Sequence, residues 1–168
     1  MIDKLKYIFY FVFLLLVQTL ILDQVSVSVY VNAFVYILFV MMLPIDTNKY
    51  VVLLLGLLMG LCVDLFNSTL GLHASAGLLA AFVRSFALDI YSPHDGYENN
   101  KQLSVRNYGY GWFLKYAITI ILIHHLWLFI FESMSISNFL FTLAKAGVSS
   151  LTSLAVILLF HLMLMSRK

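Results

Sequence analysis

The chain has 168 residues, of which 62% are apolar and only 11% are charged, and its formal net charge is +2. Soluble domains average about a quarter charged residues, so this composition excludes an ordinary soluble domain. It also excludes a dense basic surface for nucleic acid, and the single cysteine, Cys62, excludes an intrachain disulfide.

Long apolar runs predict an all-α integral membrane protein that forms one polytopic domain over residues 1–168, with the lipid bilayer around it. A helix needs about 20 apolar residues to cross the hydrocarbon core of a bilayer. Runs of this kind predict six transmembrane helices, at residues 5–22, 25–43, 50–66, 71–90, 112–131 and 139–165. Lys4 and Lys6 precede the first run as in a signal peptide. That run is long for a signal, and no small-residue cleavage site follows it, so we expect an uncleaved span.

The second and sixth runs depart from a simple span. Residues 25–31 alternate with a period of two, which is typical of a strand, but an isolated strand cannot satisfy its backbone in lipid. We therefore expect a helix that starts near Val29 and ends at Pro44. The sixth run is longer than the hydrocarbon core requires, so its helix should tilt, bend near Gly147, or project into the cytoplasm.

The basic residues predict the orientation. If the N-terminus is cytoplasmic, no Lys or Arg falls in an outer loop, and only Arg84 and Lys145 fall well inside spans. The others then lie in cytoplasmic segments or at the cytoplasmic ends of spans: Lys4, Lys6, Lys49, Lys101, Arg106, Lys115, Arg167 and Lys168. Because cations are retained on the cytoplasmic side, both termini should be cytoplasmic. A cytoplasmic loop at residues 92–111, rich in turn residues, would separate the fourth and fifth spans.

Small residues line one face of the third predicted helix. Gly56, Gly60 and Asp64 are four residues apart, and the two glycines allow close approach of another helix. Ala76 and Ala80 belong to a similar packing face in the fourth helix. A carboxylate inside a span is costly unless it is paired, protonated or hydrated, which makes Asp64 a candidate site residue. A solvated helix-end aspartate, or one bonded to neighbouring backbone, is an equal alternative.

A second polar stripe lies in the sixth predicted helix, at Lys145, Ser149 and Ser153. The third helix should run outward and the sixth inward, which puts Asp64 and Lys145 in the same outer half. We therefore predict an outer polar cluster organised by an Asp64–Lys145 pair and made up of Asp64, His73, His124, Lys145 and Ser149. The alternative for Lys145 is snorkelling to the interface. For Arg84 we expect snorkelling or contact with phosphate, with Asp89 nearby.

Motifs for catalysis or metal binding are missing from the sequence. His124 and His125 are adjacent on a helix, so their side chains diverge by about 100° and cannot easily hold one ion. No zinc-ligand spacing, Gly-x-Ser-x-Gly turn or phosphate-binding glycine loop is present. We expect no metal, no cofactor and no enzymatic activity.

Three stretches together resemble a known family. They are Val17-Gln18-Thr19-Leu20, Leu43-Pro44-Ile45, and the unit from Gly56 to Ala74 with the pattern G-x-x-x-G-L-x-x-D followed by L-G. With six short spans, this order resembles MreD, the bacterial rod shape-determining membrane protein. Residues 92–98 and 123–126 are similar to one branch of that family. The positions that match the family pattern are Gly56, Gly60, Asp64, Leu70 and Gly71.

The resemblance implies a non-enzymatic scaffold of the cell-elongation machinery (the elongasome) in the bacterial inner membrane. Such a scaffold supports cell shape and peptidoglycan synthesis. Its partners would be an MreC-like single-span protein and, in the wider assembly, MreB filaments and the cell-wall synthases. The implied fold is similar to the substrate-binding subunits of energy-coupling-factor vitamin transporters. The resemblance implies no catalytic residue, and loop 92–111 is longer than in many relatives.

Two other functions remain open. A transporter substrate-binding subunit would share the architecture, but such subunits usually carry an Ala-x-x-x-Ala motif in the first helix. The corresponding stretch here, residues 11–16, is bulky throughout. An intramembrane enzyme that uses Asp64 and a histidine is the least supported alternative.

Overall fold

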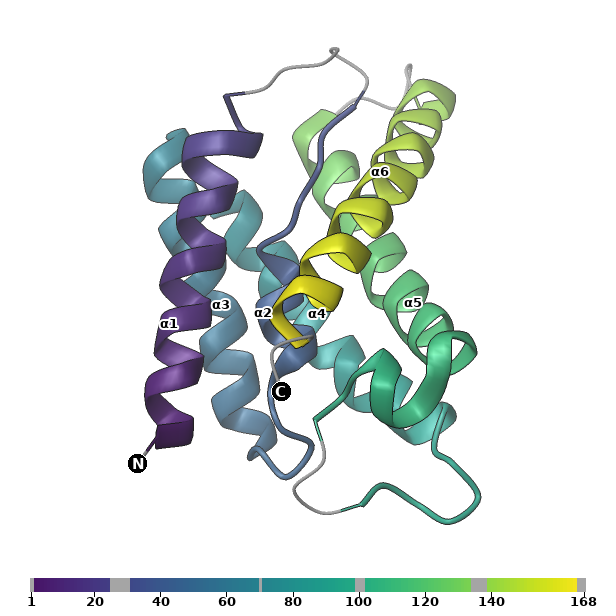
Figure 1. Ribbon diagram of the computed structural model, residues 1–168. Coiled ribbons are helices and arrows are strands. Elements are labelled where there is room, and N and C mark those ends of the chain that lie inside the picture. The colour runs from purple at the N-terminus through teal and green to yellow at the C-terminus, as the bar shows by residue number, and fades with distance from the viewer. Residues whose placement is uncertain (1, 25–30, 70, 99–101, 134–138, 166–168) are drawn as a thin grey trace.

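A computed structural model describes residues 2–24, 31–69, 71–98, 102–133 and 139–165. Every regular element within these ranges is helical (Figure 1). The elements are α1 (Ile2–Leu16), the π-helix η1 (Val17–Leu22), α2 (Ile37–Met42), α3 (Lys49–Asn67), α4 (Leu72–Ile90), α5 (Val105–Ser133) and α6 (Phe139–Met165). The expected all-α class is confirmed.

Four segments of the described chain are long and apolar enough to cross a membrane: Leu5–Leu22, Lys49–Asn67, Val105–Ser133 and Phe139–Leu164. They indicate a membrane-embedded protein, but not the six spans expected. α4 has the same length as α3, yet it carries His73, Arg84 and Asp89, which lower its hydropathy. A span at residues 71–90 therefore stays a prediction.

The predicted second helix, over residues 25–43, is wrong in the described part of the chain. Only Ile37–Met42 is helical, and residues 31–36 before it form an irregular, largely extended segment. Residues 25–30 lie outside the described ranges. Side chains from η1 and α6 bond the backbone of the extended segment, so a helix is not needed to satisfy it.

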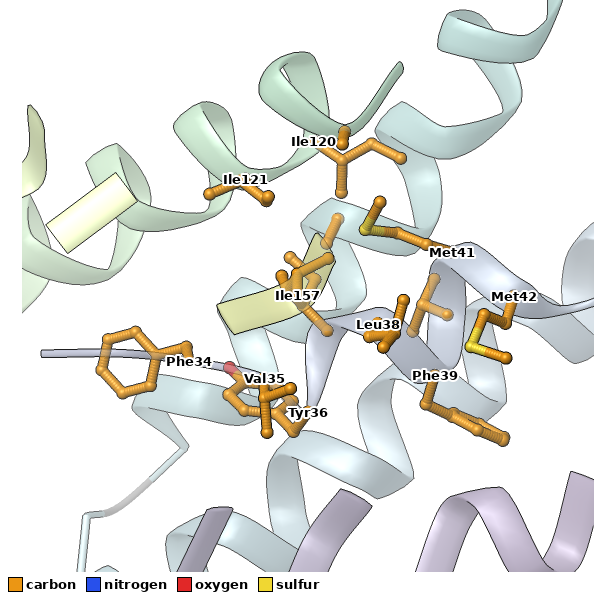
Figure 2. Packing of buried hydrophobic residues seen from close by; sticks show 14 of the residues in the cluster. Phe34, Val35, Tyr36, Leu38, Phe39, Met41, Met42, Ile120, Ile121 and Ile157 are labelled. Atoms are coloured by element: carbon orange, nitrogen blue, oxygen red, sulfur yellow. The ribbon is translucent and has the colours of Figure 1, made fainter. Parts of the chain in front are cut away.

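This segment and α2 form the centre of the molecule. Successive helices pack side by side, α3 on α4, α4 on α5 and α5 on α6, while α1 contacts α3. No side chain from Phe34 to Leu43 is more than 6% exposed. Phe34, Val35 and Tyr36 belong to one buried cluster with Ile120 and Ile121 of α5 and Ile157 of α6. In Figure 2, Ile157 lies next to Val35, and Met41 of α2 lies on the side of Ile120. The least regular part of the chain is thus enclosed by the long helices.

The long helices present apolar side chains outward. Leu5 and Ile8 on α1, Leu65 on α3, and Leu140 and Leu151 on α6 are all more than 60% exposed. In water such a surface would be costly, whereas in a bilayer it matches the lipid chains. Figure 1 also shows α6 inclined to α1 and α3, which fits the tilt expected for a long helix.

The connection between α4 and α5 is shorter than the predicted loop at residues 92–111. α5 begins at Val105 and contains a kink at Gly109, where φ is +82°. A residue with a positive φ cannot continue the helix, and glycine is the residue that adopts such a φ most readily. Tyr97 anchors the connection, because its hydroxyl donates to the carbonyl of Leu88 at 2.8 Å.

Candidate functional site

Asp64 lies near the C-terminal end of α3 and caps α4. Its Oδ1 accepts hydrogen bonds from the Thr69 hydroxyl (2.6 Å), the His73 backbone N–H (3.0 Å) and the His73 ring Nδ1 (2.9 Å). Its Oδ2 accepts from the backbone N–H of Ala74 at 2.9 Å. A carboxylate at a helix N-terminus satisfies free N–H groups and is favoured by the helix dipole. Asp64 is therefore bonded to neighbouring backbone, one of the alternatives that the sequence left open.

The glycine stripe of α3 faces α4. A Cβ on Gly56 would lie 2.7 Å from the carbonyl oxygen of Gly77, and one on Gly60 would overlap the carbonyl of His73. The chain's own α4 thus occupies this face, which is not free for another protein. Ala76 and Ala80 of α4 are fully buried.

The turn between α3 and α4 contains two further predicted positions. Gly71 takes a φ of +76° at the N-cap of α4, a conformation that favours glycine. Leu70 lies outside the described residues.

The predicted pair between Asp64 and Lys145 is wrong. The Lys145 Nζ lies 2.9 Å from Oε2 of Glu132 near the end of α5, and 4.5 Å from the centre of the Phe129 ring. The physical reason is proximity: α6 packs on α5, whereas Asp64 already has four donors from its own turn and α4. Within the predicted cluster, Asp64 and His73 are in direct contact.

The other two members of that cluster serve the central segment. The Ser149 hydroxyl accepts from the backbone N–H of Asn32 at 3.1 Å. The His124 Nε2 lies 2.6 Å from the hydroxyl of Tyr36, just before α2. Both side chains therefore hold the segment that replaced the predicted second helix.

Gln18 binds the backbone of the extended segment, a role that its place in the Val17–Leu20 stretch did not predict. Its Oε1 accepts from the backbone N–H of Val35 at 2.7 Å, and its Nε2 donates to the carbonyl of Ala33 at 3.1 Å. Ser153 of α6 adds a bond from the backbone N–H of Phe34 at 2.8 Å. Gln18 belongs to η1, and a π-helical turn inside a longer helix often marks a functional position. The signal in the sequence was one amide within an otherwise apolar run.

Arg84 is an internal residue and does not reach an interface. Its Nη2 donates to the carbonyls of Leu43 (2.7 Å) and Pro44 (3.0 Å), and the Tyr116 hydroxyl donates to the carbonyl of Met41 at 3.1 Å. Together they satisfy carbonyl groups at the C-terminal end of α2, where a positive charge is favoured. The expectation of snorkelling or phosphate contact is wrong.

Three buried histidines surround Phe34 without converging on one point. The Phe34 ring centre lies 5.5 Å from that of His73, 5.9 Å from that of His124 and 5.3 Å from that of His125. His125 binds the Ser153 hydroxyl through Nε2 at 2.9 Å. Among the residues that the structure describes, no three His, Cys, Asp or Glu side chains are placed to share a metal ion.

An open pocket of about 260 Å³ lies at the end of the molecule opposite the N-terminus. We call it the outer pocket. Its apolar wall includes Phe34, Leu128 and Phe129. Its polar lining comes from the ends of η1, α3 and α5, from the start of α4 and from the extended segment. The residues are Asp23, Asn32, Asn67, Thr69, His73 and Glu132.

The outer pocket is the best candidate for a binding site in the described structure. Small-molecule sites are typically concave and mostly apolar with a few convergent polar groups, as here. Of its polar residues, only His73 belongs to the cluster predicted from the sequence. The others are single polar residues at span ends, which sequence alone does not bring together.

Comparison of the chain with models of known protein families, with curated proteins and with solved structures gives no match.

Proposed function

We propose that the protein is a non-enzymatic membrane scaffold of the bacterial cell-elongation machinery, the role implied by its resemblance to MreD. In this proposal it resides in the inner membrane with both termini cytoplasmic. It binds an MreC-like single-span protein and, through that assembly, supports cell shape and peptidoglycan synthesis by MreB-associated synthases.

One observation carries the proposal: the motif behind the resemblance builds a rigid helical hairpin. Gly56 and Gly60 permit close contact between α3 and α4, and Asp64 caps α4. Gly71 supplies the left-handed turn at the N-cap of α4. All of these residues stabilise the packing of α3 on α4, which suits a scaffold better than an enzyme.

The distribution of basic residues supports the proposed topology. In Figure 1 the N-terminus, the connection between α2 and α3, and the connection between α4 and α5 lie at one end of the molecule. Lys49 and Arg106 begin helices at that end. We propose six passes across the membrane, the second made by residues 31–36 with α2 and the fourth made by α4. Cytoplasmic retention of cations then gives the orientation.

An apolar groove between α5 and α6 supports docking of a single-span helix. The groove measures about 470 Å³, and Ala144, Gly147 and Leu151 line it. A Cβ on Gly147 would meet nothing within 4 Å, in contrast to the glycines of α3. Small residues let helices associate closely in membranes, and here the chain itself leaves the small face uncovered.

Affinity purification of the tagged chain in mild detergent tests the proposal. We expect an MreC-like single-span protein to co-purify in stoichiometric amount from the source organism. Gly147→Leu should fill the groove and reduce recovery of the partner, while the exposed control Leu58→Ile should leave it unchanged. Recovery of the chain without any single-span protein would overturn the proposal.

The outer pocket favours one alternative, a substrate-binding subunit of a small-molecule transporter. Its size and its polar lining suit a small ligand. Against it stands the bulky stretch at residues 11–16, where an Ala-x-x-x-Ala coupling motif would be expected. Mass spectrometry of extracts from the purified protein separates the two functions, because a transporter subunit should retain a vitamin-like molecule.

A further inference from the structure

We propose that the outer pocket binds a small organic cation, with the ligand's ammonium or guanidinium group held between Asp23 and Glu132. The proposal goes beyond the scaffold function and does not depend on a partner protein. A cation site on this face would be a separate activity of the same fold.

Asp23 supplies a carboxylate that has no counter-ion among the described residues. Its Oδ1 accepts from Gln18 Nε2 at 2.6 Å and its Oδ2 accepts from Asn67 Nδ2 at 2.8 Å. Both donors are neutral amides, and within the described residues no basic side chain forms an ion pair with Asp23. Two amide bonds fix the carboxylate in position, and each oxygen keeps a lone pair for a further donor. Asp23 is therefore an oriented acceptor on the pocket wall.

Glu132 and Phe129 already hold one alkylammonium group. The Lys145 Nζ lies 2.9 Å from Oε2 of Glu132 and 4.5 Å above the Phe129 ring, and both partners line the pocket. A carboxylate next to an aromatic face is a recognised arrangement for binding ammonium groups. Lys145 thus serves as an internal stand-in that shows which chemistry this wall accepts. It also partly occupies Glu132, so it competes with a ligand.

His73 adds a buried acceptor to the same pocket. Its side chain lines the cavity and the residue is only 5% exposed. The Thr69 hydroxyl donates to Asp64, so the nearby His73 Nδ1 is the natural donor to the Asp64 carboxylate. When the ring is neutral, this contact places its proton on Nδ1 and leaves a lone pair on Nε2. Nε2 makes no hydrogen bond with the described residues, and a ligand N–H would satisfy it.

The balance of charge selects the ligand class. The pocket lining contains two carboxylates and no lysine or arginine, so an anionic ligand would be repelled. Phe34, Leu128 and Phe129 provide an apolar wall for a short carbon skeleton. The ammonium group could belong to a free amine or to the ethanolamine headgroup of an outer-leaflet lipid. Both offer the same chemistry to Asp23 and Glu132.

Ligand-observed NMR on the purified chain in detergent tests the proposal with benzylamine as the probe. Benzyl alcohol and benzoate are the neutral and anionic controls. We expect saturable binding of benzylamine alone. Asp23→Asn should weaken it by about 10-fold, the scale of one lost charge-assisted hydrogen bond. Asp46→Asn, which removes a charge from the exposed surface at the opposite end, should leave it unchanged.

Two further variants guard against an effect of misfolding. Glu132→Gln changes an exposed side chain and should also weaken binding, whereas Lys145→Met should strengthen it by about threefold, because it frees Glu132 from a surface-type ion pair. A damaged fold cannot produce a gain in affinity. Equal binding of benzyl alcohol, or unchanged affinity in both Asp23→Asn and Glu132→Gln, overturns the proposal.

The source of the cation follows from the same assay in nanodiscs. If benzylamine binds more weakly in nanodiscs of phosphatidylethanolamine than in nanodiscs of phosphatidylglycerol, the ethanolamine headgroup is the natural occupant of the pocket. If the two lipids give the same affinity, the natural occupant is a free amine. Either result requires that benzylamine binds, so absence of binding in both lipids contradicts the proposal.

Discussion

The carboxylate of Asp64 binds His73 twice, through the backbone N–H at 3.0 Å and through the ring Nδ1 at 2.9 Å. The contact joins the end of α3 to the first turn of α4. It fixes both the direction of α4 and the orientation of an imidazole that lines the outer pocket. One aspartate therefore links the architecture of the hairpin to the geometry of the pocket.

Replacing Asp64 should destabilise the α3–α4 hairpin. Asp64→Ala leaves buried donors of Thr69, His73 and Ala74 without their acceptor, and we expect a loss of about 2–3 kcal/mol in the free energy of unfolding. Asp64→Asn keeps one acceptor oxygen and should cost about half as much. Denaturant unfolding in detergent measures both values. Equal stability of the wild type and Asp64→Ala would contradict the capping role.

Lys145 should be energetically coupled to Glu132 and not to Asp64. A double-mutant cycle for Lys145→Met and Glu132→Gln should give a coupling free energy of about 0.5–1 kcal/mol, since the pair is partly exposed. The cycle for Lys145→Met and Asp64→Asn should be additive within about 0.3–0.5 kcal/mol. Restoration of stability by a charge swap between Asp64 and Lys145 would show that the structure pairs the wrong residues.

The glycines of α3 and α6 should respond oppositely to alanine. Gly60→Ala puts a methyl group against the backbone of His73, and we expect a loss of about 1–3 kcal/mol from the forced separation of the helices. Gly147→Ala enters open space within a helix and should stabilise the protein by about 0.5–1 kcal/mol. Thermal unfolding of the two variants against the wild type measures the contrast. A similar gain in both would indicate that only helix propensity matters, and a similar loss in both would contradict the open space beside Gly147.

Hydrophobic periodicity predicted the long helices well, because α1 with η1, α3, α5 and α6 each need only a continuous apolar run. The extended segment at residues 31–36 could not be predicted in the same way. Its backbone is satisfied by Gln18, Ser149 and Ser153, which lie far from it in sequence. A rule that excludes non-helical backbone from lipid gave the wrong element, because here side chains of the protein satisfy the backbone in place of a helix.

The candidate site shows the same limit. Asp64 and His73 belong to one hairpin, so their proximity follows from local spacing. The pairing of Lys145 with Glu132 depends on how α5 and α6 pack. The hydrogen bond between Asp23 and Asn67 depends in the same way on how η1 and α3 pack. Charge and depth alone favoured a pair between Asp64 and Lys145. They carry no information about which helices are neighbours, so they could not identify Glu132 as the partner.

Cysteine labelling tests the proposed orientation. In a Cys62→Ala background, Ser68→Cys lies in the turn between α3 and α4, and Ser92→Cys lies in the connection after α4, at opposite ends of the molecule. Both side chains are exposed, so neither site is hidden from a reagent by the fold. A membrane-impermeant maleimide added from outside should modify position 68 and spare position 92, because basic residues gather at the end that contains Ser92. Permeabilised cells should label both positions equally, which controls for reactivity. Labelling of position 92 from outside would reverse the orientation and place the outer pocket on the cytoplasmic side.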